Sequence, residues 1–255
     1  RLSADVAATL GPTAWPARHP WTEAFPGWAS SSPLTTAQPV TVDLSYSKAQ
    51  PLGFYAPDDG QVVRISVPDA LQNAGYVIQI GERYDDLRSL DHIETWRRAP
   101  MLYRSVPITG PVTEVNSIFG GALYLVVPDG ESGSATLEVE GALGMVVYTR
   151  GESASDDWAS SMASNAVPVT ILQERGQVRL VVSSDEADRV IDPDTVIDFW
   201  TGFQEHHMEL AQEPSLRRFE SHWIFDTQVG WGYANATSDR ITYPMIAEAW
   251  ALRTR

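Results

Sequence analysis

The sequence predicts a β-rich α+β protein, in which a jelly-roll-like antiparallel β-sandwich is followed by a smaller mixed α/β portion. Between Pro39 and Gly151 the chain consists of short runs rich in Val, Ile and Tyr, which Pro, Gly and Asp interrupt. Runs of this length and spacing are typical of a sandwich. After Gly151 the apolar residues recur at the three-and-four spacing of a helix. The change of period indicates that a different architecture begins there.

The predicted strands of the sandwich share β-branched and aromatic residues. They cover residues 40–44, 62–67, 76–80, 102–108, 123–127, 135–140 and 145–148. Asp58-Asp-Gly60 and Asp129-Gly130 supply hairpin turns, because Asp and Gly tolerate positive φ. Gly120-Gly121 precedes a strand and has neither the Lys of a phosphate loop nor a third spaced Gly. We therefore expect a bulge or a close backbone approach at these two glycines.

The strongest predicted helix covers residues 192–212, with Asp192 as its N-cap and Pro193 at its first position. Its apolar line consists of Val196, Phe199, Trp200, Phe203, His207 and Leu210. We expect this helix to bury Phe199, Trp200 and Phe203 against the mixed portion. Further strands at 177–183 and 219–225 and a short helix at 246–252 complete that portion.

Three zones follow from this pattern. Residues 1–37 form a leader that contains Trp15, Trp21 and Trp28 and, before Ser30, four prolines, without a steady period. We interpret the leader as an irregular arm laid over a neighbour. Residues 38–151 form the sandwich, and residues 152–255 form the mixed α/β portion.

The composition excludes several classes of function. The formal charge of -15 argues against nucleic acid or an anionic membrane as a partner, because both require clustered Lys and Arg. Cysteine is absent, so the sequence offers no disulfide framework, thiolate metal site or thiol nucleophile. No apolar run approaches the roughly 20 residues of a membrane span. A neutral or cationic partner remains compatible with this charge.

The histidines give no complete catalytic or metal site. His206 and Glu209 fit part of an inverted His-x-x-Glu-His zinc motif, but Leu210 stands where the second histidine is needed. Zinc sites normally need three protein ligands, so we expect these two side chains to be solvated. On a strand, His222 and Asp226 would share a face about 13 Å apart, too far for a hydrogen-bonded pair. We expect His222 to be a core or boundary residue.

Five residues are candidates for ligand contact: Trp231, Tyr233, Tyr243, Trp96 and Arg97. The first three lie in or near a Gly-rich segment, where a loop presents aromatic rings to the apolar face of a sugar. The other two combine a stacking indole with a guanidinium that binds a carboxylate, such as that of a sialylated sugar. The alternative is that the aromatic rings belong to the core and that Arg97 and Arg98 form ion pairs with Asp or Glu side chains, which are in excess in this sequence.

Several sequence motifs occur in the order typical of a known family. They are Trp96-Arg-Arg-Ala-Pro100, Ser105-Val-Pro-Ile108, Ile118-Phe-Gly-Gly121, Ala135-Thr-Leu-Glu-Val-Glu-Gly-Ala142, and, flanking these, Gly53-Phe-Tyr-Ala-Pro57, Asp226-Thr-Gln-Val-Gly-Trp231 and Tyr243-Pro-Met245. In these features residues 35–246 resemble the enhancin-like metallopeptidases (peptidase family M60), which include viral enhancins and bacterial mucin-degrading enzymes.

The resemblance implies a β-rich N-terminal portion packed against a thermolysin-like portion. There, a zinc-bound water activated by the glutamate of a His-Glu-x-x-His helix cleaves O-glycosylated proteins such as mucins. No His-Glu-x-x-His occurs in these 255 residues. We therefore expect no cofactor in this chain, no activity of the chain as given, and zinc only in a longer parent whose reading frame continues past Arg255. We also expect a secreted or cell-surface bacterial protein whose partner is a glycan or glycoprotein.

Three functions remain open at this point. The chain is the N-terminal portion of a secreted peptidase, or a non-catalytic module that binds glycans or glycoproteins, or a structural or assembly subunit. In the third case, it would contact another chain through the leader or through the C-terminal helix. That helix carries an apolar face of Ile246, Ala249, Trp250 and Leu252, which we expect to pack on further structure.

Overall fold

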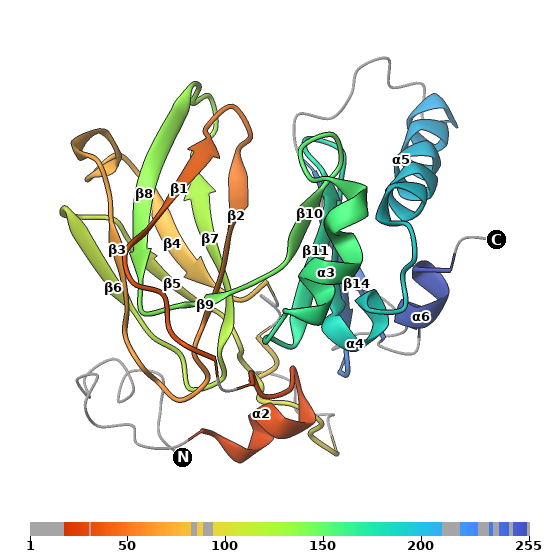
Figure 1. Cartoon of the computed structure of the whole chain (residues 1–255), viewed down its shortest axis with the longest axis horizontal. Coiled ribbons are helices and arrows are strands. Elements are labelled where there is room, and N and C mark those ends of the chain that lie inside the picture. Colours follow the sequence, from red (N-terminus) through yellow and green to blue (C-terminus); the bar gives the residue numbers. More distant parts are fainter. Residues whose placement is uncertain are drawn as a thin grey trace.

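The computed structural model describes residues 18–30, 32–82, 86–88, 94–210, 220–228, 235–236, 240–244 and 247–253. Figure 1 shows a β-sandwich beside a third sheet, with helices on the far side of that sheet. The prediction of a β-rich α+β fold is confirmed.

The first sheet of the sandwich has the strand order β1 (Gln38–Asp43), β8 (Ser134–Glu140), β3 (Val63–Ser66) and β6 (Val112–Val115). The second has the order β5 (Arg104–Pro107), β4 (Val77–Ile80), β7 (Gly121–Val127), β2 (Lys48–Ala56) and β9 (Leu143–Gly144). All pairings within both sheets are antiparallel. The 3-10 helix η2 (Asp69–Leu71) follows β3.

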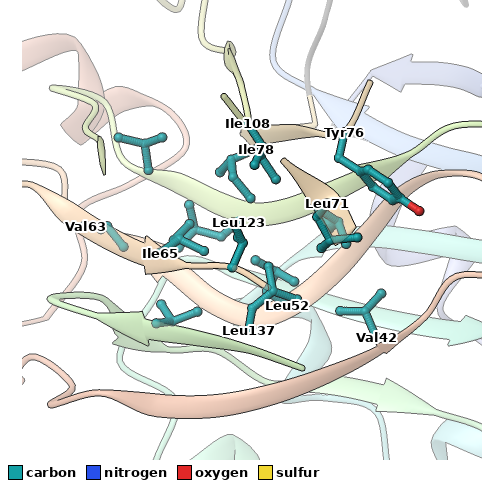
Figure 2. Close-up of a cluster of buried hydrophobic side chains, with 14 of the residues drawn as sticks. Val42, Leu52, Val63, Ile65, Leu71, Tyr76, Ile78, Ile108, Leu123 and Leu137 are labelled. Carbon is teal, nitrogen blue, oxygen red and sulfur yellow. The ribbon is translucent and has the colours of Figure 1, made fainter. Parts of the chain in front are cut away.

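The core of the sandwich lies between these two sheets. Strand β8 alternates exposed and buried residues, and its buried Leu137 and Val139 face inward. Figure 2 shows Leu137 together with Ile65 and Leu123 in the cluster that fills this space. The alternation of polar and apolar residues that predicted the strands therefore reflects one solvent-exposed and one packed face of the first sheet.

The second sheet is packed on both faces. On β7, Leu123 and Leu125 point into the sandwich core, whereas Ala122 and Tyr124 join a separate cluster with Ile171 of the third sheet. The molecule is thus built in layers: sheet, sheet, sheet and helices. Because β7 is buried on both sides, it appears in the sequence as a continuous apolar run.

The third sheet has the order β10 (Val147–Thr149), β11 (Val169–Glu174), β12 (Val178–Ser183), β13 (Ser221–Asp226), β15 (Arg240–Pro244) and β14 (Asn235–Ala236). Strands β12, β13 and β15 are parallel neighbours, and β10 is parallel to β11. The chain therefore changes sheet between Gly144 and Val147, slightly before its period changes. Strand β10 of the third sheet overlaps residues 145–148, which we had expected to form a sandwich strand.

Helices cover the outer face of the third sheet: α3 (Trp158–Ala163) after η3 (Ser155–Asp157), α4 (Ser184–Ala187), α5 (Pro193–Leu210) and α6 (Glu248–Ala251). None of the helices among the described residues is long and apolar enough to cross a membrane. Leu252, expected to pack on structure beyond this chain, is instead buried in the cluster beneath the helices. The side chains of Ile246 and Trp250 lie outside the described residues.

Helix α5 begins as predicted, because Asp192 accepts hydrogen bonds from the Asp194 amide at 3.0 Å and from the Thr195 hydroxyl at 2.5 Å. Trp200 is buried at 5% exposure, as predicted. The expected burial of Phe199 and Phe203 is wrong, because their exposed fractions are 52% and 45%. Among the described side chains of the helix after Pro193, the buried ones are Val196, Ile197, Trp200, Thr201 and Gln204, and the side chain of His207 lies outside them. Both phenylalanines stand beside this narrow stripe and touch Trp200 only edge-on.

The leader packs onto the sandwich. Its helix α2 (Pro20–Ala24) is followed by Phe25, which is buried with Ala99 and Leu102. Arg18 forms an ion pair with buried Asp58 at 3.0 Å, and the Ala29 amide donates to the same carboxylate at 3.1 Å. Trp21 and Trp28 remain exposed at 43% and 44%, and Trp15 lies outside the described residues.

Candidate functional site

The segment that carries Trp96 and Arg97 lies against the carboxyl end of β13. The Arg97 amide donates to the Gln228 side-chain oxygen at 2.9 Å, and the Gln228 amide group donates to the Thr95 carbonyl at 3.2 Å. The Gln228 backbone N–H in turn donates to Asp226, the last residue of β13, at 2.9 Å. We refer to Trp96, Arg97 and Gln228 as the β13-end site.

A buried ion pair anchors this segment. The Arg98 guanidinium meets the Asp226 carboxylate at 2.8 Å, and both side chains are 0% exposed. Arg98 also donates to the Ala99 carbonyl at 2.7 Å. For Arg98 the alternative expectation of structural ion pairing is therefore confirmed. Its burial fixes the backbone on which the two preceding side chains stand.

Trp96 and Arg97 themselves face solvent. Trp96 is 36% exposed, and Arg97 is also exposed. Next to a rigid anchor, an indole and a guanidinium offer one ring face for stacking and one planar fork for a carboxylate. This combination suits a sugar that carries an acidic group, because the ring meets the apolar face of the pyranose and the fork meets the acid.

The other three candidate residues are not brought to this place among the described residues. Tyr243 stacks on Trp223 with the ring centroids 5.5 Å apart and the planes 2° from parallel. Both rings lie in the cluster beneath the helices, whereas Asp226 shares the opposite face of β13 with Ile224, which packs toward the sandwich. Trp231 and Tyr233 lie outside the described residues, so their predicted ligand contact remains a prediction.

The histidine candidates do not form a metal site. No group of three or more His, Asp or Glu side chains able to hold a metal occurs within the parts of the chain that the structure describes. His206 is exposed, with its Nδ1 2.6 Å from the Gly202 carbonyl of its own helix, and Glu209 is exposed. The expectation that both are solvated is confirmed. The zinc-binding helix expected from the family is not among these residues.

His222 is a buried boundary residue, as predicted, and it belongs to a polar cluster between the second and third sheets. Its Nε2 lies 3.5 Å from Glu220, which also pairs with Arg179. Burial by itself favours the neutral form of Glu220, but Arg179 and His222 outweigh it and hold the pKa of this carboxyl below its usual value of 4.5. The carboxylate therefore stays charged and acts as a structural partner rather than as a proton acceptor.

Arg179 links the two halves of the molecule, a role that sequence reasoning missed. It donates to the Ala49 carbonyl of β2 and to Gln173 at 2.9 Å, and its guanidinium lies 5.9 Å from the centre of the Tyr124 ring. A signal was present, because Arg179 stands alone in the apolar run Val178-Arg-Leu-Val-Val182. An arginine in a strand buried on both faces needs a buried partner.

Comparison with known proteins supports the expected family. Residues 32–140 match the family described as the N-terminal domain of M60-like peptidases. Among curated proteins, TRPM8 channel-associated factor 2 of Homo sapiens is 26% identical over 217 residues, which cover 82% of this chain and 23% of that protein. The chain thus spans less than a quarter of the length of this relative.

Solved M60 structures share the fold. IMPa from Pseudomonas aeruginosa in complex with an O-glycopeptide matches with a TM-score of 0.61 and 13% identity, over 85% of this chain and 29% of that one. The M60 catalytic domain of ZmpC from Clostridium perfringens in complex with the sialyl T antigen matches with a TM-score of 0.60 and 12% identity, over 81% and 45%. The predicted resemblance to the N-terminal part of M60 metallopeptidases is confirmed.

Proposed function

We propose that this chain, in which residues 32–140 form an M60-like N-terminal domain, binds O-glycosylated proteins and is the non-catalytic portion of a longer secreted or cell-surface peptidase. The observation that carries the proposal is the β13-end site. Exposed Trp96 and Arg97 stand directly before an arginine that is fully buried in an ion pair. Because the backbone beneath this pair is fixed, a ligand that binds there does not have to order that backbone.

The ligand chemistry follows from these side chains. Two of the solved relatives hold an O-glycopeptide and the sialyl T antigen, which combine pyranose rings with, in the second case, an acidic sugar. Trp96 suits the ring and Arg97 suits the carboxylate of such a glycan. The charge of -15 opposes the approach of an anion, so we expect modest affinity that increases when salt screens the protein's field.

In this proposal, peptide bonds are cleaved by the catalytic portion of the longer protein and not by this chain. The described residues offer no metal-binding cluster, and the sequence given contains no His-Glu-x-x-His. We expect the chain alone to retain no zinc after dialysis against buffer, and to leave mucin intact. One equivalent of retained zinc, or cleavage that a chelator abolishes, would contradict this division of labour.

A second candidate function is association with another protein. The relatives named TRPM8 channel-associated factors suggest it, and exposed Phe199 and Phe203 on α5 offer apolar surface. The two candidates give different results in one experiment. Immobilised sialylated O-glycopeptide, with the unglycosylated peptide as its control, should capture the chain but not Trp96→Ala. Equal capture by both peptides would favour protein association and count against glycan recognition.

A further inference from the structure

A polar groove opens at the seam between the sandwich and the third sheet. Its volume is about 480 Å³, within the range of about 300–1,000 Å³ found for small-molecule sites. The side chains that matter here are Asp43, Ser45, Tyr46, Ser134, Glu152 and Arg175. The first four come from the first sheet and the β1–β2 turn, and the last two from the third sheet and its connections (Figure 1).

The groove and the β13-end site lie at opposite ends of the strands of the third sheet. Arg175 is in the turn that precedes β12, and the Ser221 amide at the start of β13 donates to Gln177 in the same turn at 2.9 Å. Asp226 ends β13, five residues later. At a rise of about 3.3 Å per residue, the two ends of β13 are roughly 17 Å apart. A ligand in the groove therefore does not touch Trp96 or Arg97.

The one cationic side chain named in the groove, Arg175, already has hydrogen-bond acceptors within the protein. Arg175 donates through Nε to Glu152 at 2.6 Å and through Nη2 at 3.1 Å, and its Nη1 donates to Gln50 at 3.4 Å. Glu152 therefore occupies the fork formed by Nε and Nη2, and these bonds use three of the five guanidinium N–H donors. The Glu152 side chain is 54% exposed and keeps acceptor capacity toward the groove.

The opposite wall carries an aromatic ring in a defined place. Asp43 accepts from the Ser45 amide at 2.8 Å, which fixes the turn that leads to Tyr46. The Tyr46 ring lies close to Gly176, where an added Cβ would stand 3.0 Å from Cε1. The glycine thus lets the ring approach the backbone across the seam. Tyr46 is half-buried, so part of its ring is available to a ligand.

We propose that this groove binds a neutral saccharide, with a pyranose ring against Tyr46 and its hydroxyls bonded to Asp43, Ser134 and Glu152. The two carboxylates and one guanidinium leave the lining with a net negative charge, which disfavours acidic sugars and phosphates. Sugar hydroxyls both donate to carboxylates and accept from serine, so they match this polar lining. The site is separate from the β13-end site and does not depend on it.

The test titrates the whole chain with the neutral T-antigen disaccharide and with its sialylated form. We expect the neutral sugar to bind, and Tyr46→Ala to weaken that binding about tenfold or more while Tyr46→Phe preserves it. Ser134→Trp should block the groove from an exposed position without disturbing Tyr46. The loss caused by Tyr46→Ala should be the same in a chain that also carries Trp96→Ala, because the two sites lie apart.

The possible outcomes separate this proposal from the function proposed above. If Trp96→Ala abolishes all sugar binding while Tyr46→Ala and Ser134→Trp have no effect, the groove is not a saccharide site and the β13-end site stands. If the neutral sugar binds and is lost in Tyr46→Ala and Ser134→Trp, while sialylated glycopeptide does not bind at all, the groove stands and the β13-end site falls. Tighter binding of the sialylated sugar at the groove would also overturn the proposal.

Discussion

At the scale of single residues, the Arg98–Asp226 pair fixes the segment that bears Trp96 and Arg97. Replacing Arg98 with Ala leaves the buried Asp226 carboxylate without its cation. We expect a loss of about 3–5 kcal/mol in the free energy of unfolding, measured by urea denaturation. Arg97→Ala is the control, because its side chain is exposed, and it should change stability by about 0.5 kcal/mol or less. Similar losses in both variants would contradict the anchoring role.

Glu220 gives a prediction about pH. Its pKa in the folded protein is below the usual 4.5, so its charge stabilises the fold at higher pH, and this contribution is lost as the pH falls through the folded-state pKa. Burial raises the pKa of Asp58, which gives the opposite slope, so the wild-type curve alone does not isolate Glu220. Glu220→Gln does isolate it. The stability difference between wild type and this variant should be constant well above pH 4.5 and shrink at lower pH.

At the scale of elements, Trp200 is the largest side chain that helix α5 buries among the described residues. Its indole N–H donates to the Ala251 carbonyl of α6 at 3.0 Å, and its ring packs on Trp223 with the centroids 4.3 Å apart. We expect Trp200→Ala to cost about 3–5 kcal/mol in thermal or urea unfolding. Phe203→Ala removes a half-exposed ring from the same helix and should cost far less. Comparable costs would mean that the packing of α5 is not centred on Trp200.

The turn into β7 depends on Gly121. Its φ is +145°, and a Cβ there would stand 2.7 Å from Ile80 Cγ2 and 2.9 Å from the Gly81 amide nitrogen. We expect Gly121→Ala to lower stability by about 1–3 kcal/mol, since β4 or β7 must shift. Gly144→Ala is a matched control in the same sheet, because its added Cβ meets nothing within 4 Å. A stable Gly121→Ala variant would rule out this close approach as a constraint.

Several elements were predictable because their cause is local. The Asp192 cap, the glycine approach at Gly121 and the strands of the sandwich each follow from a pattern within a few residues. The exposure of Phe199 and Phe203 was not predictable, because the width of a helix's buried stripe depends on how far the sheet beneath it extends. The partner of Arg98 was not predictable either, since Asp226 lies 128 residues away.

At the scale of the whole molecule, the sandwich and the third sheet form a layered body with a polar link. Arg179 reaches from β12 to the Ala49 carbonyl of β2, and Glu220 neutralises it. The sequence predicted a sandwich and a mixed portion but not that the third sheet would cover the second. The continuous apolar run of β7 signals burial on both faces, but it does not say which sheet provides the second packed face.

The central claim is that the β13-end site recognises an O-linked glycan. The most direct test is to map amide and indole NMR shifts of the labelled chain as sialylated O-glycopeptide is added, with the unglycosylated peptide as the control. The account predicts shifts of the Trp96 indole, assigned with Trp96→Phe, and of the Arg97 and Gln228 signals, with none from the bare peptide. Binding that leaves these signals unmoved, or identical shifts from both peptides, would contradict it.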